Sequence, residues 1–415
     1  MIYMLSIKEV AEKLGVSTDT IRRWEKKGLI RASRDANNYR IFNLEEVTRL
    51  NDKVNGTSKL SNNYRILNAP ASASIRSVDL FAGCGGTALG LENAGVEHVM
   101  LVERDRDAVA TLRHNRPDWN VVCDDVEKVK FEVWNGAVDI VEGGFPCQAF
   151  SYAGKKMGFD DTRGTLFHEF ARAIREIRPK IAIGENVRGL LSHDNGRTIS
   201  VMVSTLQSLG YRVAYKILRS QYFDVPQKRE RLIIFALRND LAAPILFPKE
   251  RDYTISLQDA IGDLPQSEGQ QYSKRKKEIM EQVPMGGYWR DLPTEIQKEY
   301  MGASYFMGGG KTGMARRLSW DEPSLTLTCN PAQKQTERCH PSETRPLSVR
   351  EYARIQVFPD EWQFVGSVSS RYKQIGNAVP VNLGFHIGLA AIAMLTGQNH
   401  DDFEQVPEIP FCEVY

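Results

Sequence analysis

The spacing of hydrophobic positions divides the chain into two parts of different character. In the first fifty residues, apolar side chains recur at intervals of three and four, as on helices that bury one face. From residue 77 onward, short apolar runs alternate with helical patterns, as in a parallel sheet whose strands are joined by helices. The pattern therefore predicts a small, mainly helical head followed by a larger α/β region.

The head is predicted to be a winged helix-turn-helix domain. A capping box at Ser6 and Glu9 opens a first helix, and a second helix is expected over residues 18–27. Two short strands, 29–30 and 39–42, would form the wing, and a third helix would follow. Basic side chains on the second helix and the wing are candidate DNA contacts: Arg22, Arg23, Lys26 and Arg40. The alternative is a solvated basic face on a packing module.

Composition narrows the class of protein. The 415 residues suffice for two or three domains, and 42% hydrophobic and 26% charged residues are typical of a globular protein. Because no apolar run is long enough to cross a bilayer and charges interrupt the N-terminal segment, we expect a cytoplasmic protein without a membrane partner. The six cysteines have no metal-binding spacing and are expected to be reduced. A net charge of +2 neither supports nor excludes a nucleic-acid partner.

The first strand–helix unit of the α/β region contains a glycine-rich loop. A predicted strand over 78–81 leads into a turn with Gly83 and Gly85, where a ligand could lie against the backbone at a helix N-terminus. After the next two strands come Glu103, which could accept ribose hydroxyls, and Asp125, which could meet an adenine amino group. Each acid alone could be an ordinary strand-end residue, but the succession predicts an adenosine-type cofactor.

A rigid loop presents a cysteine after another short strand. The apolar run 138–141 ends in paired glycines, and Pro146 with Cys147 follows. The glycines allow close approach of a substrate, and proline fixes its own φ. Cys147 is therefore a candidate nucleophile, although a lone cysteine is often a buried structural residue.

Three charged residues near strand ends are further candidates for chemistry. Glu185 is expected to end a strand over 180–184, and in a closed pocket burial would raise its pKa and suit an acid role. Arg229 and Arg231 should project to the same side before a buried strand over 232–237, where they could hold a base carbonyl and a phosphate. The alternative for all three is an ordinary surface position beside a strand.

The ordered motifs of the α/β region resemble those of the DNA cytosine-5 methyltransferases. They read D-L-F-A-G-C-G-G, E-R-D, F-P-C-Q, E-N-V, Q-K-R-E-R and G-N-A-V, across roughly residues 77–395. The segments LSIKEVAEKLGVSTDTIRRWEKKGLI and YRIFNLEEV resemble the DNA-binding head of MerR-type regulators. The resemblance implies a Rossmann-like S-adenosylmethionine-dependent methyltransferase fold with a smaller target recognition lobe, a winged helix-turn-helix head, and S-adenosylmethionine as the cofactor.

The resemblance also assigns roles to individual positions. Cys147 would add to a cytosine flipped out of the duplex, and Glu185, Arg229 and Arg231 would assist that addition. The residues expected around the cofactor are Phe81, Gly83, Gly85, Glu103, Asp125, Pro146, Leu166 and Asn377. The residues expected at DNA, besides those of the head, are Ser151, Gln227 and Thr326.

We expect five segments along the chain: a DNA-binding head (1–55), a linker (56–75), a catalytic domain (76–240), a target recognition domain (241–345), and a supporting motif with a C-terminal helix that returns to the catalytic domain (346–400). The predicted protein is a monomeric DNA cytosine-5 methyltransferase of a restriction–modification system that acts on double-stranded DNA and protects it from a cognate endonuclease. Its head would bind separate operator DNA. Two alternatives are a transcriptional regulator that senses the cofactor, and a tRNA cytosine-5 methyltransferase.

Overall fold

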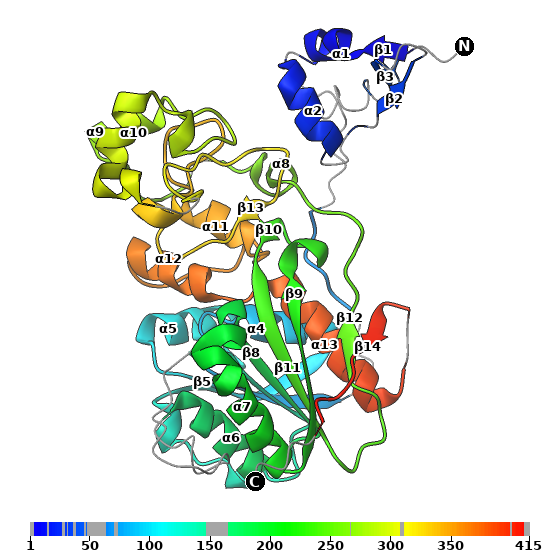
Figure 1. Ribbon diagram of the computed structural model, residues 1–415. Helices are drawn as coiled ribbons and strands as arrows, with labels where there is room; N and C mark the ends of the chain where they lie inside the picture. The colour runs from blue at the N-terminus through cyan, green and yellow to red at the C-terminus, as the bar shows by residue number, and fades with distance from the viewer. Residues whose placement is uncertain are drawn as a thin grey trace. The chain divides into compact units, whose positions relative to one another are not determined.

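The computed structural model divides the chain into two compact units, residues 1–63 and 64–415, which are described separately (Figure 1). The structure describes residues 4–14, 16–26, 30, 32–35, 39–44, 47, 64–69, 74–146, 165–265, 267–307, 311–398 and 401–410. The predicted roles of Cys147 and Ser151 therefore lie outside the described residues, as does most of the third helix expected in the head, of which Leu44 and Val47 are described and helical.

The N-terminal unit contains the helices α1 and α2 and a three-stranded sheet of order β1-β3-β2. Its elements are β1 (Met4–Ser6), α1 (Ile7–Lys13), α2 (Thr18–Lys26), β2 (Ala32–Arg34) and β3 (Arg40–Asn43). The capping box is confirmed, because the backbone N–H of Ser6 donates to Glu9 Oε2 at 2.7 Å and the N–H of Glu9 donates to Ser6 Oγ at 3.3 Å. Ile30, expected in a strand, lies outside the strands and in the core, and the pairing with β3 begins at Ala32; Leu29 lies outside the described residues.

Two of the predicted DNA contacts in the head take part in ion pairs. Arg22 pairs with Asp19 at 2.6 Å, and Arg40 pairs with Glu25 at 2.7 Å across α2 and β3. Arg23 is exposed on α2. Lys26 is the last residue of α2.

The larger unit contains a mixed seven-stranded sheet of order β6-β5-β4-β7-β8-β11-β9. Its strands are β4 (Ile75–Leu80), β5 (Val96–Glu103), β6 (Val121–Cys123), β7 (Ile140–Gly143), β8 (Ile181–Val187), β9 (Tyr211–Arg219) and β11 (Glu230–Arg238). The pairs from β6 through β8 are parallel, whereas β11 is antiparallel to both β8 and β9. The predicted α/β methyltransferase architecture is thus confirmed, and the parallel strands bring their carboxyl ends to one edge.

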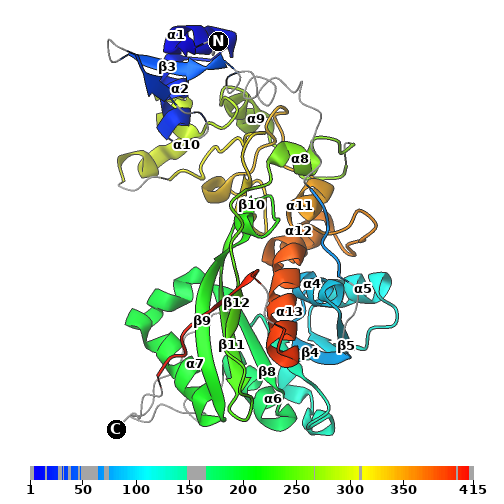
Figure 2. The ribbon, with the colours of Figure 1, turned by 90° about the vertical axis from the view of Figure 1, so that its right-hand side faces the viewer.

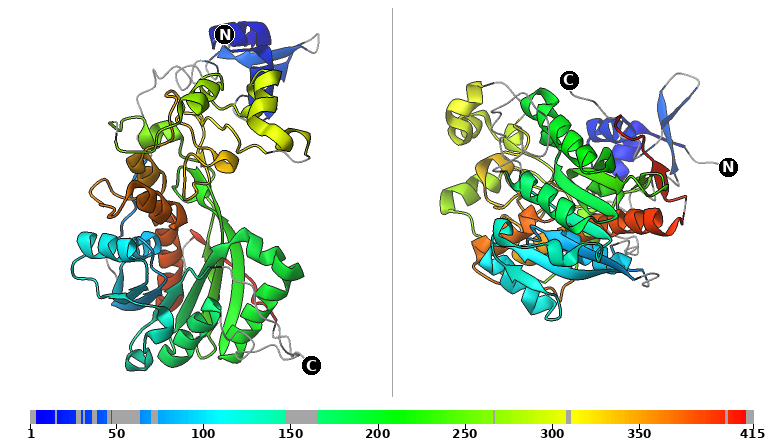
Figure 3. Two further views of the ribbon diagram at one scale, coloured as in Figure 1. Left: turned by 90° about the vertical axis from the view of Figure 1, so that its left-hand side faces the viewer. Right: turned by 90° about the horizontal axis from the view of Figure 1, so that it is seen from below.

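Helices cover both faces of this sheet, so the unit has three layers (Figures 2 and 3). One face is packed by α4 (Gly86–Ala94), α5 (Arg106–Asn115) and α13 (Val381–Thr396), and the other by α6 (Leu166–Ile177) and α7 (Arg197–Ser208). Leu91 and Leu383 bury themselves in the first core, and Phe170 and Leu206 in the second. The sheet is therefore held in place from both sides, and its edge can carry a precisely built site.

The C-terminal helix α13 packs along α4, as expected for a segment that returns to the catalytic domain. Glycines allow the close approach: a Cβ on Gly86 would lie 2.2 Å from the carbonyl oxygen of Val379, and one on Gly90 would lie 2.4 Å from that of Val381. Residues 368–396 are long and apolar enough to cross a membrane, but 89% of their most apolar window is buried within the unit. We therefore assign this stretch to the protein core.

A second, less regular lobe follows the sheet in the chain and has its own core, built around Met280, Trp289, Tyr300 and Cys339. Its elements include α8 (Leu257–Ile261), α9 (Lys274–Met280), α10 (Thr294–Met301) and β13 (Ser324–Leu325), and α11 (Val349–Ile355) and α12 (Val368–Asn377) follow. The lobe is joined to the sheet by the parallel pairing of β13 with β10 (Gln227–Lys228). A further antiparallel pair is formed by β12 (Leu246–Pro248) and β14 (Phe403–Gln405).

Part of the expected linker belongs to the larger unit. The N–H of Leu67 donates to Asn382 Oδ1 at 3.0 Å, and the N–H of Ala69 donates to the carbonyl oxygen of Asn93 at 2.8 Å. Residues 64–69 are therefore attached to the larger unit, and Ile75 already begins β4.

Candidate active site

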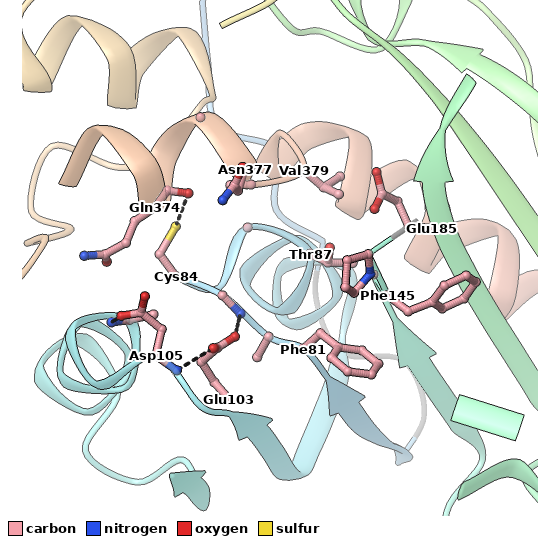
Figure 4. A pocket seen from close by; sticks show the side chains of 18 of the residues that line it. Phe81, Cys84, Thr87, Glu103, Asp105, Phe145, Glu185, Gln374, Asn377 and Val379 are labelled. Carbon is pink, nitrogen blue, oxygen red and sulfur yellow. Dashed lines mark hydrogen bonds between the residues drawn. The ribbon is translucent and has the colours of Figure 1, made fainter. Parts of the chain in front are cut away.

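A cavity of about 700 Å³ lies at the carboxyl ends of β4, β5, β7 and β8. The opposite wall comes from residues 326–329, just after β13, and from the end of α12 with the turn that follows it. Figure 4 shows Glu103 and Phe81 toward one end of this pocket and Glu185 toward the other, with Gln374 and Asn377 across from them. Segments separated by up to three hundred residues thus form one site.

Glu103 is held rigidly at the end of β5. Its two carboxylate oxygens accept hydrogen bonds from the backbone N–H groups of Gly83, at 2.8 Å, and Asp105, at 2.7 Å. One bond comes from the glycine-rich turn and the other from the N-terminal cap of α5, so the carboxylate has a fixed orientation toward the pocket. A carboxylate oxygen has lone pairs beyond those used here, and these can accept the hydroxyls of a ribose.

Phe81 lines the same end of the pocket in an unusual backbone conformation. Its φ is +66°, in the left-handed region that non-glycine residues rarely adopt. The N–H groups of Phe81 and Ala82 both donate to the carbonyl oxygen of Val102, at 3.0 and 3.1 Å, and so hold the strained turn. Such strain is concentrated at functional sites, where the surrounding structure imposes it.

The other predicted cofactor residues fall into two groups. Asp125, Pro146, Leu166 and Asn377 line the pocket, as does Gly83. Gly85 does not: it begins α4 with φ of +91°, and a Cβ there would lie 2.7 Å from Leu112 and 3.3 Å from Trp362. The role of Gly85 in this structure is therefore to allow the turn and its packing, which corrects the expected contact with the cofactor.

Glu185 occupies the opposite end of the pocket, beside an arginine. It lies within β8, which continues to Val187, so the expectation that it ends its strand is wrong; pairing with β11 extends the strand. Glu185 Oε1 lies 2.6 Å from Arg231 Nε, and both side chains are largely buried. Burial raises the pKa of Glu185, and the charges of Arg231 and Arg229 offset part of this rise.

Arg229 is buried behind this ion pair and is 1% exposed. Its guanidinium donates to the carbonyl oxygens of Leu327, at 3.2 Å, and Gly376, at 3.0 Å, and so connects β10, β13 and α12. Burial, followed by the neighbouring charge of Arg231, lowers the pKa of Arg229. Arg229 and Arg231 both line the pocket, which agrees with the prediction that they project to one side.

Two residues next to the cysteine loop appeared in the sequence only as parts of motifs, the paired glycines and E-N-V, without a role of their own at Glu185. Asn186 Nδ2 donates to the carbonyl oxygen of Phe145 at 2.8 Å and ties the start of that loop to β8. A Cβ on Gly144 would lie 3.2 Å from Glu185 Oε2, so this glycine leaves room for the carboxyl group. The motif E-N-V already indicated a role for Asn186, because it places an amide directly beside the catalytic candidate Glu185.

The sequence interpretation also missed a pair of buried acids. Asp79 on β4 is the register partner of Glu142 on β7, and they are 1% and 2% exposed. Both line the pocket. The available signal was an acid inside each of two otherwise apolar strands.

The predicted DNA contacts of the larger unit differ in accessibility. Thr326 lines the pocket and donates its hydroxyl to the carbonyl oxygen of Lys228 at 2.7 Å. Gln227 is fully buried; its amide donates to Gln356 Oε1 at 2.8 Å and accepts from the N–H of Leu327 at 2.9 Å. The structure therefore gives Gln227 a bracing role between the two lobes in place of the expected contact with DNA.

Comparison with known proteins agrees with the motifs. A family model described as C-5 cytosine-specific DNA methylase matches residues 75–393, and one described as MerR family regulatory protein matches residues 6–42. The chain is 56% identical to the type II methyltransferase M.Eco47II of Escherichia coli, over 94% of this chain and 95% of that protein. It is 52% identical to the type II methyltransferase M.PspPI of a Psychrobacter strain, over 95% and 97%. Both matches extend beyond the methylase region into the N-terminal unit.

Solved structures share the fold at lower sequence identity. Entamoeba histolytica methyltransferase EhMeth aligns with a TM-score of 0.55 and 13% identity, over 78% of this chain and 99% of that one. A mutant of Spodoptera frugiperda DNMT2 aligns with a TM-score of 0.53 and 18% identity, over 77% and 100%. At these identities the likeness concerns the fold alone.

Proposed function

Because the chain belongs to the family of C-5 cytosine-specific DNA methylases, we propose that its pocket holds S-adenosylmethionine at the Glu103 end and a flipped cytosine at the Glu185 end. The activity is that of a DNA (cytosine-5-)-methyltransferase of the type II restriction–modification class. The observation that carries the proposed placement is the separation of the two carboxylates: Glu103 is fixed by backbone N–H groups, and Glu185 is fixed by an arginine.

The cofactor end fits S-adenosylmethionine. A cavity of about 700 Å³ has room for a nucleoside-sized ligand together with a base. Glu103 would hold the ribose, Phe81 would cover one face of the adenine, and Asp125 would meet its amino group; Gly83, Pro146, Leu166 and Asn377 would line the remainder. The cofactor supplies an electrophilic methyl group on a sulfonium.

The Glu185 end fits a cytosine whose ring must be activated. Carbon 5 becomes nucleophilic only after a nucleophile has added at carbon 6, and this addition is easier when N3 accepts a proton. Glu185 can supply that proton because burial raises its pKa, and Arg231 fixes the orientation of its carboxyl group. Arg229 would hold this arrangement from behind through Leu327 and Gly376.

Cys147 is the proposed nucleophile, although it lies outside the described residues. It follows directly on Phe145 and Pro146, and Asn186 ties Phe145 to the strand of Glu185. The thiolate would add to carbon 6, the methyl group would pass to carbon 5, and loss of the carbon 5 proton would then expel the thiolate. Ser151, on the same loop, and Thr326 would contact DNA around the flipped base.

Methyl transfer to DNA tests these assignments. Wild-type enzyme and Cys147→Ser are incubated with DNA and methyl-tritiated S-adenosylmethionine, and bisulfite sequencing identifies the modified base. We expect no transfer by Cys147→Ser, with DNA binding retained. Cys123→Ser is the matched control, because Cys123 is an exposed thiol of β6 that does not line the pocket. Transfer by Cys147→Ser at the wild-type rate would refute the assignment, and absence of transfer by the wild type would favour a cofactor-sensing regulator.

We also propose that the head binds operator DNA and regulates expression of the restriction–modification genes. The match to the MerR family and the exposed Arg23 on α2 support this role, with Arg22, Lys26 and Arg40 as further contacts. A gel shift of the full-length protein on its upstream DNA, in excess unlabelled substrate DNA, tests it. Arg23→Glu should abolish the shift and leave methylation intact. Persistence of the shift in this variant would contradict the role of α2.

Further aspects of the organisation are proposed on the same basis. Residues 241–345 would read the bases that flank the target, in a monomeric enzyme that acts in the cytoplasm and protects DNA from a cognate endonuclease. The separate core of this lobe and its attachment through β10 and β13 support a semi-independent recognition module. Residues 346–400 would support that module and complete the catalytic domain, since α13 packs on α4.

A further inference from the structure

The pair Asp79 and Glu142 is not required by the chemistry described above, yet it lines the same pocket. The two residues stand opposite each other on neighbouring parallel strands and are almost completely buried. Burial of carboxyl groups without cationic partners is costly, and apolar residues at both positions would have stabilised the sheet. Their presence therefore points to a function in the pocket.

The hydrogen bonding of the pair is incomplete. Asp79 Oδ2 and Glu142 Oε2 are buried oxygens that no donor within the described part of the chain reaches. The two carboxyl groups lie in contact with each other, and Glu142 also receives the hydroxyl of Thr87 from α4. Two carboxyl groups in contact cannot both be ionised in a buried site, so one proton is shared between them.

Among the residues that the structure describes, the charged groups that face the pair are acids. Glu103 faces Asp79 from β5, and Glu185 faces Glu142 from β8. Burial raises the pKa of Asp79 to about 7, and burial together with Asp79 raises the pKa of Glu142 well above its usual value. The pair is therefore poised to lose its proton near neutral pH if a positive charge approaches.

The arginines of the pocket lie on the other side of Glu185. Arg231 pairs directly with Glu185, and Arg229 is held by backbone carbonyl groups. Both act on the charge of Glu185, so the floor of the pocket between Glu103 and Glu185 stays acidic. A ligand that carries positive charge would complement this floor, whereas an anionic ligand would be repelled.

We propose that Asp79 and Glu142 form a proton-linked counter-ion for the positive charge of the methyl donor, releasing a shared proton when the donor binds and regaining it when methyl transfer removes the positive charge of the sulfur. This inference rests on the proposed placement of S-adenosylmethionine. The proton passes from the carboxyl pair to solvent, and no bond of the ligand is broken. The demethylated product carries one positive charge fewer, because its sulfur is neutral. The pair therefore distinguishes donor from product through charge.

Isothermal titration calorimetry of the full-length enzyme tests this inference without catalysis. Binding heats of S-adenosylmethionine and S-adenosylhomocysteine are measured near pH 7 in buffers of different ionisation enthalpy, and the slope gives the number of protons exchanged. We expect proton release with the donor and a smaller release with the product. Affinity for the donor should rise with pH by up to about tenfold per pH unit below neutrality and level off above it.

Glu142→Gln is the decisive variant, because its amide can donate to Asp79 and remove the need for the proton. Proton release and the pH dependence of affinity should both be lost, with donor binding retained. Glu97→Gln is the matched control, since Glu97 is an exposed residue of β5 in the same sheet. Asp79→Asn provides a second test if Glu142→Gln does not fold.

The outcomes are distinguishable. Donor binding without proton release, equal release for donor and product, or release that survives in Glu142→Gln would each overturn the inference. Absence of binding to the wild type would instead refute the placement of the cofactor.

Discussion

Two parts of the pocket, the target end at Glu185 and the floor at Asp79 and Glu142, bury carboxyl groups in different ways. At the target end, Glu185 lies 2.6 Å from Arg231, so a cation compensates its charge. At the strands β4 and β7, Asp79 and Glu142 face each other, and a shared proton must compensate. In the first arrangement, Arg231 fixes the orientation in which Glu185 can donate a proton. In the second, the protonation of Asp79 and Glu142 responds to the charge of a ligand.

The difference shows that burial alone does not determine what a carboxyl group can do. Burial raises the pKa of Glu185, Asp79 and Glu142 alike, but the neighbours differ. Arginines oppose the rise at Glu185, whereas Asp79 and Glu185 reinforce the rise at Glu142, and Glu103 reinforces the rise at Asp79. The following substitutions alter either the surroundings of Glu185 or those of the Asp79–Glu142 pair, and they are ordered by the size of the expected effect.

Glu185→Gln should have the largest effect, on the rate of methyl transfer. Loss of a positioned proton donor lowers rates by about 10²- to 10⁴-fold. Single-turnover incorporation of labelled methyl groups measures the rate, and calorimetry should still show proton release on donor binding. Methyl transfer at the wild-type rate would contradict the proposed role of Glu185. Loss of the proton release would contradict the proposal that Glu185 and the Asp79–Glu142 pair act separately.

Arg231→Met should destabilise the fold, because it leaves Glu185 buried without its cation. Removal of one partner of a buried ion pair costs about 3 kcal/mol or more. Urea unfolding measures the loss, which should shrink at low pH, where Glu185 becomes protonated. Arg188→Met is the control, since Arg188, directly after β8, forms an exposed pair with Glu230 on β11, where about 1 kcal/mol or less is expected. Equal losses in both variants would contradict the role of burial.

Glu142→Gln should change stability in the opposite sense above neutral pH. A carboxyl group whose pKa is raised by folding binds more protons in the folded than in the unfolded state, so it lowers stability as pH rises from about 4 toward its folded pKa. The variant lacks this effect and should be more stable than the wild type by about 1–2 kcal/mol at alkaline pH. Urea unfolding across pH checks this; a constant difference at every pH would argue against a shared proton.

Thr87→Val should have the smallest effect, because it removes one hydroxyl and preserves the shape. Loss of a single hydrogen bond costs about 1 kcal/mol. The rate of methyl transfer should be unchanged, since Thr87 contacts Glu142 and not Glu185. A large fall in rate would show that the two parts of the pocket are coupled more tightly than proposed.

The sequence predicted the features that depend on local pattern. Glu103 and Asp125 were expected in the pocket because each follows a parallel strand, and such strands end at one edge of a sheet. The capping box of the head was likewise visible as a short motif. These assignments needed no knowledge of distant contacts.

The features that the sequence did not predict depend on long-range pairing. Gln227 was expected to contact DNA, whereas in the structure it is hydrogen-bonded to Gln356, 129 positions away. The pairing of Asp79 with Glu142 is a matter of strand register, which hydrophobic spacing does not specify between strands separated by sixty residues. Glu185 was expected at a strand end because the apolar run of its own segment stops before it. Pairing with β11 extends the strand beyond Glu185.

The glycine contact between α4 and α13 has a consequence for the order of events during synthesis. Translation proceeds at about 5–20 residues per second, so α13 follows α4 out of the ribosome by roughly 15 to 60 s. During that interval the nascent chain already contains Glu103, Cys147 and Glu185, but Gly86 and Gly90 still lack the helix that covers them. The wall that carries Asn377 is also missing. We therefore expect each molecule to gain methylating activity late and abruptly, once α12 and α13 have been synthesised and packed.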